Sequence, residues 1–189
     1  MKKIICISVV ILNIFRTTAQ NSNELKEGDK VAEFSALNDD GNVWKSANVK
    51  TDFLVVYFYP AAMTGGCTKQ ACAYRDDKAT FDKMGVTVVG ISGDEVKNLQ
   101  YFKEAYQLNF PLLSDNEGNI SKIFGIPTNK GGEITREIGG ENLLLIRGIT
   151  TPRWTFVLDK DRKIIYKNAW LELYDFPVAY FPKFFHPDP

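Results

Sequence analysis

The chain has 189 residues, its 23 lysines and arginines balance 23 aspartates and glutamates, and 44% of its residues are hydrophobic. This length suits one domain of ordinary size or at most two small ones, and the composition excludes collagen, coiled-coil and disordered classes. Zero net charge argues against nucleic-acid binding through phosphate contacts, and a single histidine, His186, argues against Ser-His-Asp hydrolases and His-rich metal sites.

The first residues have the three parts of a secretory signal peptide. Lys2 and Lys3 form a basic start, residues 4–15 are mostly apolar, and small residues lead up to Ala19. We expect residues 1–19 to be removed and the mature chain, from residue 20, to work in the periplasm or cell envelope of a bacterium. A stable membrane anchor is less favoured because a spanning helix needs about 20 apolar residues. The other alternative is an N-terminal core helix.

The next segments alternate between strand and helix patterns. An opening β-hairpin is expected from residues 31–34 and 43–44 around a polar turn. Residues 52–59 form a continuous apolar and β-branched run, typical of a strand buried on both faces, and Pro60 ends it. A helix is predicted over residues 67–83. Its inner surface is expected to include Ala71, Tyr74, Ala79 and Phe81.

The second half of the chain continues the alternation. It predicts a buried strand at 86–91, then a helix at 96–106 with Leu99 and Phe102 facing inward. A short helix at 120–124 and a closing hairpin, with strands at 154–158 and 163–166, follow. Strands alternating with helices and finished by an antiparallel pair predict a single α/β domain, a three-layer sandwich around a mixed sheet.

Two stretches fit this pattern less well. Residues 130–147 are expected to form an inserted β-hairpin before the strand that follows Arg153. The tail, residues 170–189, is rich in aromatic residues and proline, which is hostile to a regular helix. We expect this irregular tail to cover exposed core, and a docking surface is the alternative.

The chemistry is expected at Cys67. A cysteine that opens a helix after a buried strand lies among unpaired N–H groups at the positive end of the helix dipole, which favours the thiolate. Gly65 and Gly66 allow close approach of the backbone. Thr64 can place a hydroxyl at the same point, and Pro60 adds an apolar wall without a competing N–H. This combination suits a thiolate that attacks a small polar molecule.

Cys72 is the other cysteine of the mature chain, since Cys6 leaves with the signal peptide. In an intact helix, five residues would separate the Cα atoms of Cys67 and Cys72 by roughly 8.6 Å, whereas a disulfide needs them within about 7 Å. A bond between them therefore requires local unwinding, which favours a disulfide that forms and opens during turnover. The alternatives are a permanent disulfide, which export permits, and a zinc site, for which four good ligands are not in view.

The pattern Pro60-x-x-x-Thr64-x-x-Cys67 resembles the active-site motif of the peroxiredoxins. The added Cys72 resembles the resolving cysteine of the bacterioferritin-comigratory-protein (peroxiredoxin Q) branch, the atypical 2-Cys type. The similarity continues through GISGD at 90–94, NFPLLSD at 109–115, FGI at 124–126 and RWTFVLD at 153–159. It covers roughly residues 25–167.

The resemblance implies a thioredoxin-like fold and reduction of hydrogen peroxide or organic hydroperoxides. It makes Cys67 the peroxidatic thiolate and Cys72 the resolving thiol, with Thr64 and Pro60 shaping the peroxide pocket. It also brings Arg153 to Cys67, where its permanent charge stabilises the thiolate; a surface ion pair is the alternative for this arginine. No metal or organic cofactor is implied, and the reductant is a thioredoxin-like dithiol protein.

Two positions depart from the resembled pattern: Gly65 stands where proline is common and Gln70 where glutamate is common. Both changes affect how the loop and the helix start are held. Two other functions are kept beside the peroxidase: a thioredoxin-like disulfide reductase, which would need a Cys-x-x-Cys pair, and a redox-sensing module that uses the same disulfide as a switch. The protein is expected to be a monomer or a weak dimer.

Overall fold

The computed structural model describes residues 24–169, so the predicted signal peptide and the tail 170–189 lie outside the described residues. The elements in chain order are β1 (Ser35–Leu37), β2 (Val43–Lys45), the 3-10 helix η1 (Ser46–Asn48), β3 (Phe53–Phe58), α1 (Gly65–Asp76), α2 (Lys78–Lys83), β4 (Val86–Ser92), α3 (Val96–Tyr106), β5 (Leu112–Ser114), α4 (Asn119–Ile123), β6 (Asn129–Ile138), β7 (Glu141–Thr150), β8 (Trp154–Asp159) and β9 (Ile164–Asn168). Within these residues, no helix is long and apolar enough to cross a bilayer.

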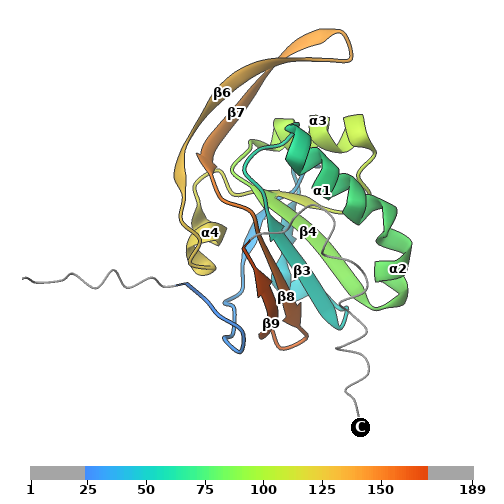
Figure 1. Ribbon diagram of the computed structural model, residues 1–189, viewed down its shortest axis with the longest axis vertical. Helices are drawn as coiled ribbons and strands as arrows, with labels where there is room; N and C mark the ends of the chain where they lie inside the picture. Colours follow the sequence, from blue (N-terminus) through green and yellow to red (C-terminus); the bar gives the residue numbers. More distant parts are fainter. Residues whose placement is uncertain (1–23, 170–189) are drawn as a thin grey trace, which may run out of the picture.

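A mixed sheet of five strands forms the centre of the fold, in the order β5-β4-β3-β8-β9 (Figure 1). Strands β3, β4 and β5 run parallel, whereas β8 is antiparallel to β3 and β9 is antiparallel to β8. Leu54 to Phe58 of β3 are all buried, as a strand covered on both faces requires. The predicted mixed sheet is confirmed.

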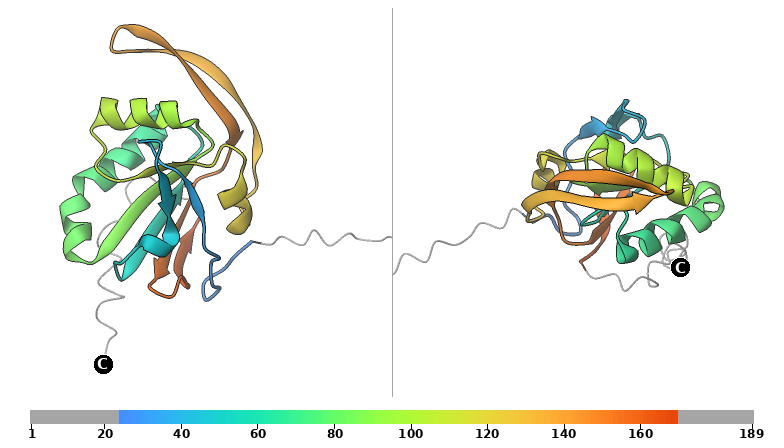
Figure 2. Two further views of the ribbon diagram at one scale, coloured as in Figure 1. Left: turned by 180° about the vertical axis from the view of Figure 1, so that it is seen from behind. Right: turned by 90° about the horizontal axis from the view of Figure 1, so that it is seen from above.

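Side chains from the two faces of this sheet enter two separate apolar cores. Val55 and Tyr57 of β3 pack with the buried residues of α1, α2 and α3. Leu54, Val56 and Phe58 point to the opposite face, where α4 and the N-terminal segment cover the sheet. Figures 1 and 2 show these elements on the two sides of the sheet, which confirms the predicted three-layer arrangement.

The prediction of a single helix over 67–83 was wrong in one respect, because this segment forms two helices, α1 and α2. The break falls at Asp77, whose φ of −87° and ψ of 0° leave the helical region. This break changes which residues of the second piece reach the core: Phe81 is buried with 1% exposure, whereas Ala79, predicted to face inward, is exposed.

The opening hairpin is shorter than predicted. Its strands are β1 and β2, joined by a turn in which the side-chain oxygen of Asn38 accepts the N–H groups of Asp40 and Asn42. Residues 31–34 form no strand, which corrects that prediction. Val31 instead donates its N–H to the carbonyl of Arg162 at 2.9 Å, so this segment is bound to the turn between β8 and β9.

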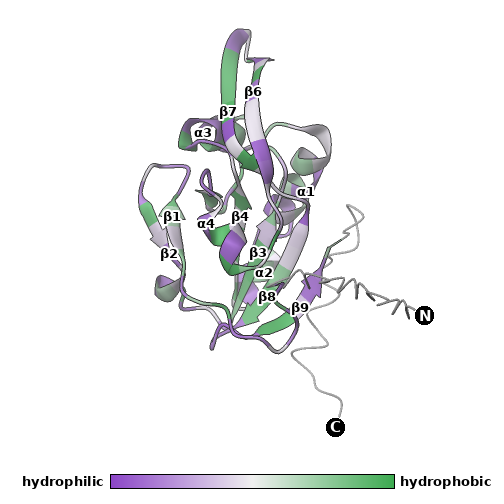
Figure 3. Ribbon diagram, turned by 90° about the vertical axis from the view of Figure 1, so that its left-hand side faces the viewer, coloured by the Kyte–Doolittle hydropathy of each residue, from purple (hydrophilic) through white to green (hydrophobic). Residues whose placement is uncertain are grey.

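The inserted hairpin is a long two-stranded arm made of β6 and β7. Its pairing runs from Asn129 opposite Thr150 to Ile138 opposite Glu141, so it is a few residues longer than the predicted 130–147. Gly139 and its neighbour at 140 make the turn with φ of 62° and 88°, a backbone conformation that favours glycine. The arm projects from the body of the fold (Figures 1 and 2), and its hydrophobic residues gather on β7 (Figure 3).

Candidate active site

Cys67 is the third residue of α1, the helix that follows the central strand β3. The first helical hydrogen bond runs from Thr68 N–H to the carbonyl of Thr64 at 2.8 Å, so the N–H groups of Gly65, Gly66 and Cys67 have no acceptor within the helix. The first turn contains no acidic side chain to neutralise them. The sulfur of Cys67 therefore lies at the uncompensated positive end of a helix, which favours a negative charge there.

The side chain of Arg153 also contacts the sulfur of Cys67. Its Nη2 donates to Cys67 Sγ at 3.3 Å. The sheet explains this contact: β8 pairs antiparallel with β3, and Trp154 lies opposite Phe58. The residue just before β8 is thereby placed at the end of β3 where the loop to Cys67 begins.

The space for this guanidinium depends on Gly66. A β-carbon added at Gly66 would lie 2.6 Å from Arg153 Nη2, closer than real contacts allow. At Gly65 an added β-carbon would meet no atom within 4 Å. The departure from the resembled pattern at Gly65 therefore leaves open space, whereas Gly66 is the glycine that the arginine requires.

The loop between β3 and α1 carries Thr64 in a held orientation. The Thr64 hydroxyl donates to the carbonyl of Ala61 at 2.9 Å, so its oxygen remains able to accept a hydrogen bond from a substrate hydroxyl. Met63, just before it, has a φ of 63°, which is unusual for a residue with a side chain. Pro60 is half-buried, two residues after the end of β3.

Sequence reasoning did not single out Asp94 as a functional residue. It is fully buried just after β4, and its Oδ2 accepts the Ala62 N–H of the same loop at 2.7 Å. The available signal was an aspartate two residues after the end of a buried parallel strand, because parallel strands bring such residues to one edge of the sheet.

Both cysteines are free thiols, Cys67 with 1% exposure and Cys72 half-buried, and helix α1 is continuous through both. The far half of α1 is tied to its neighbours: Tyr74 stacks on Tyr57 at 4.7 Å between ring centroids, and Arg75 Nη1 donates to the carbonyl of Tyr106 at 2.6 Å. The near half begins with two glycines, so unwinding costs least at the turn that carries Cys67.

Gln70, the second departure from the resembled pattern, is buried with 6% exposure on the same helix. A glutamate in this buried place would bring a negative charge into the turn after Cys67. The amide of Gln70 fills the position without that charge.

Three buried tyrosines belong to the same apolar core as Cys67. Burial raises the pKa of Tyr57, Tyr59 and Tyr74 well above the ordinary 10.0. For Tyr59 the negative charge of Asp94 adds to the effect of burial on the pKa. These phenols remain neutral near neutral pH, so they place no negative charge beside Cys67.

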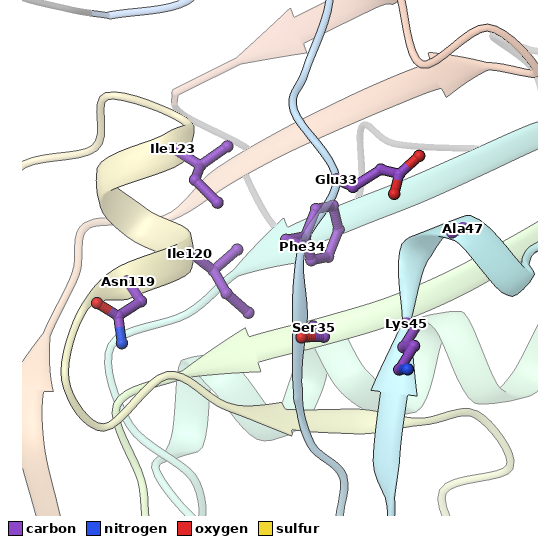
Figure 4. A pocket seen from close by; sticks show the side chains of 8 residues that line it. All are labelled: Glu33, Phe34, Ser35, Lys45, Ala47, Asn119, Ile120 and Ile123. Atoms are coloured by element: carbon purple, nitrogen blue, oxygen red, sulfur yellow. The ribbon is translucent and has the colours of Figure 1, made fainter.

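Metal ligands and cavities were the other possible bases for a site in this chain. The described residues contain no group of three or more His, Cys, Asp or Glu side chains arranged to hold a metal ion. A cavity of about 450 Å³ lies between the opening hairpin and α4, with Phe34 and Ile120 among its lining residues (Figure 4). Those two residues belong to the core on the other face of the sheet from Cys67, so this cavity is separate from the cysteine site.

Sequence comparison places the chain among known relatives. The model of the AhpC/TSA family matches residues 27–167. A protein of Mycobacterium tuberculosis named as a peroxiredoxin is 39% identical over 144 residues, which cover 76% of this chain and 85% of the relative. The chloroplastic peroxiredoxin Q of rice, Oryza sativa, is 36% identical over 159 residues, which cover 82% of this chain and 66% of the rice protein. The chain thus matches just under two thirds of the length of the rice relative.

Solved structures share the fold. A peroxidoxin from Mycobacterium tuberculosis superposes with a TM-score of 0.64 and 35% identity, covering 77% of this chain and 86% of that one. A point mutant of PrxQ from Xylella fastidiosa superposes with a TM-score of 0.68 over 87% of this chain and 99% of that one. Its identity is 20%, so it bears on the fold alone. The fold is thioredoxin-like, as the sequence resemblance implied.

Proposed function

The chain belongs to the AhpC/TSA family and to the peroxiredoxins of the Q type, and from this premise we propose that it is a thiol-dependent peroxidase. Its substrates are hydrogen peroxide or organic hydroperoxides. Cys67 is the peroxidatic residue and Cys72 the resolving residue in this proposal.

The contact between Arg153 and Cys67 carries the proposal. A guanidinium that cannot lose its charge donates to a cysteine sulfur at 3.3 Å, and the same sulfur lies at a helix N-terminus without acidic neighbours. Both features favour the thiolate, which is the nucleophilic form of cysteine. A purely structural cysteine would need neither of them.

In the first step the Cys67 thiolate attacks one oxygen of the hydroperoxide and the O–O bond breaks. The sulfur becomes a sulfenic acid, and the departing oxygen takes up a proton and leaves as water or an alcohol. The oxygen of Thr64, whose own hydrogen is directed to Ala61, accepts the hydrogen of the incoming peroxide. Arg153 donates to the reacting oxygens as charge develops on them.

In the second step the first turn of α1 unwinds and the Cys72 thiol condenses with the sulfenic acid. A disulfide forms between Cys67 and Cys72, and one water is released. In the third step a thioredoxin-like dithiol protein exchanges with this disulfide, restoring both thiols while its own pair becomes oxidised. The free thiols and intact helix describe the reduced form of this cycle.

We also propose that the protein is exported, on the sequence pattern of residues 1–19 alone. The reductant is then an exported dithiol protein. Mass measurement of the protein recovered from a fractionated cell tests this proposal. A chain that starts at residue 20 is expected, and a full-length chain in the cytoplasm would contradict export.

The test of function is peroxide consumption by the purified protein with excess thioredoxin as the dithiol reductant. We expect multiple turnovers for the wild type and none for Cys67→Ser. Mass spectrometry of the peptide that contains Cys67 and Cys72 should show the disulfide after peroxide and its loss after reductant. Full turnover by Cys67→Ser would refute the assignment.

A further inference from the structure

Asp94 is a buried carboxylate in the loop between β4 and α3, and both of its oxygens are hydrogen-bonded. Oδ2 accepts the N–H of Ala62 at 2.7 Å and the hydroxyl of Ser92 at 2.9 Å. Oδ1 accepts the side-chain amide of Asn98 and the Nε of Arg147, each at 3.2 Å. A carboxylate removed from water is stable when hydrogen bonds and an opposite charge replace the water.

Arg147 supplies that opposite charge, and it comes from the inserted arm. Among the ion pairs of residues 24–169, it is the one cation paired with Asp94, and its side chain is 13% exposed. The backbone fixes the base of the arm at the same place, because Gly148 N–H donates to the carbonyl of Gly93 at 3.0 Å. A β-carbon on Gly93 would lie 2.1 Å from the carbonyl oxygen of Ile149, so the two segments are in direct contact.

The hydrogen bond from Ala62 to Asp94 holds the loop that carries Thr64. Ala62, bound by Asp94, precedes Met63 with its φ of 63°. A residue with a side chain keeps this conformation when the groups on both sides of it are fixed. The Ala62 N–H is fixed by Asp94, and the Thr64 hydroxyl is fixed by Ala61.

We propose that Arg147 is a positioning residue for the reaction of Cys67 with peroxide. It neutralises Asp94, which holds the Ala62 N–H and thereby the orientation of the Thr64 hydroxyl. This inference rests on the proposed peroxidase function. It makes the inserted arm a support of the active-site loop.

The test compares Arg147→Met with Arg136→Met. Arg136 is exposed on β6 of the same arm, and its side chain makes no ion pair with another described residue, so it is a matched control. We expect the second-order rate constant for Cys67 oxidation to fall about tenfold in Arg147→Met, because a small displacement of a group that positions the substrate slows the reaction. It should stay unchanged in Arg136→Met, and Arg147→Lys, which keeps the charge, should recover part of the rate.

Two further readouts separate positioning from general destabilisation. Arg147→Met should cause no further loss of rate in an Asp94→Asn background, because both changes act on the same link. Amide hydrogen exchange at Ala62 should be faster in Arg147→Met than in the wild type, and this readout does not depend on peroxide. Where Asp94→Asn does not fold, the exchange measurement and the lysine variant decide.

A wild-type oxidation rate in Arg147→Met, or equal losses in Arg147→Met and Arg136→Met, would overturn the proposal. Unchanged exchange at Ala62 would overturn it as well. Failure of the proposed function would appear differently, as a wild-type protein that consumes no peroxide.

Discussion

The guanidinium of Arg153 donates to the sulfur of Cys67 at 3.3 Å, although 86 residues separate them in the chain. The antiparallel pairing of β8 with β3 brings the two together at one end of the sheet. A fixed positive charge at this distance from a sulfur favours the thiolate and remains in place when negative charge develops on the peroxide oxygens.

Replacing this arginine is expected to slow the reaction with peroxide. Arg153→Met removes the charge and the donor, so the rate constant for Cys67 oxidation should fall about a hundredfold. Stopped-flow measurement of Cys67 oxidation checks this effect. A wild-type rate constant in Arg153→Met would reject this role for Arg153.

The two adjacent glycines offer a matched pair of substitutions. Gly66→Ala places a β-carbon 2.6 Å from Arg153 Nη2 and must displace the guanidinium, whereas Gly65→Ala enters open space. We expect Gly66→Ala to slow peroxide reduction in the direction of Arg153→Met. Gly65→Ala should keep the rate of Cys67 oxidation, because the added β-carbon meets no atom within 4 Å. Equal rates for the two variants would show that the close contact with Gly66 has no effect on the chemistry.

Cys72→Ser is expected to separate the two chemical steps. The variant keeps Cys67, Arg153 and Thr64, so it should react once with peroxide at close to the wild-type rate. It lacks the second thiol, so the sulfenic acid on Cys67 should accumulate instead of a disulfide. Mass spectrometry after a single addition of peroxide should find one added oxygen on the peptide with Cys67. Continued turnover with thioredoxin would mean that another group resolves the sulfenic acid.

The buried tyrosines predict a loss of stability at alkaline pH. Burial raises the pKa of Tyr57 and Tyr59 well above the ordinary 10.0, so the folded protein keeps protons that the unfolded chain loses near that pH. The free energy of unfolding should therefore be intact below about pH 10 and fall as the pH rises above it. Denaturant unfolding at a series of pH values measures this decline. Tyr57→Phe should make it shallower, and an equally steep decline in that variant would contradict the explanation.

Local patterns predicted most of the elements. The apolar run at 52–59 became β3 at Phe53–Phe58, and the pattern at 96–106 became α3 at Val96–Tyr106. The prediction of one helix over 67–83 missed the break at Asp77, because apolar spacing alone does not distinguish one helix from two consecutive short ones. Residues 31–34 have strand-like composition, but Val31 bonds to Arg162 in the turn between β8 and β9, and Phe34 bonds to Ser46 of η1.

For the candidate site, the residues near Cys67 in the chain were readable in advance because a cysteine at a helix start has its surroundings within a few residues. The contact of Arg153 with Cys67 was expected by resemblance alone, and its cause is the β3–β8 pairing. The link from Ala62 through Asp94 to Arg147 had no counterpart in any local pattern. The spacing of apolar residues and the patterns at helix starts and turns involve residues a few positions apart, so they can be read along the chain. Which distant side chains share one buried charge depends on strand order and on the space left between packed segments, and these exist only once the chain has folded.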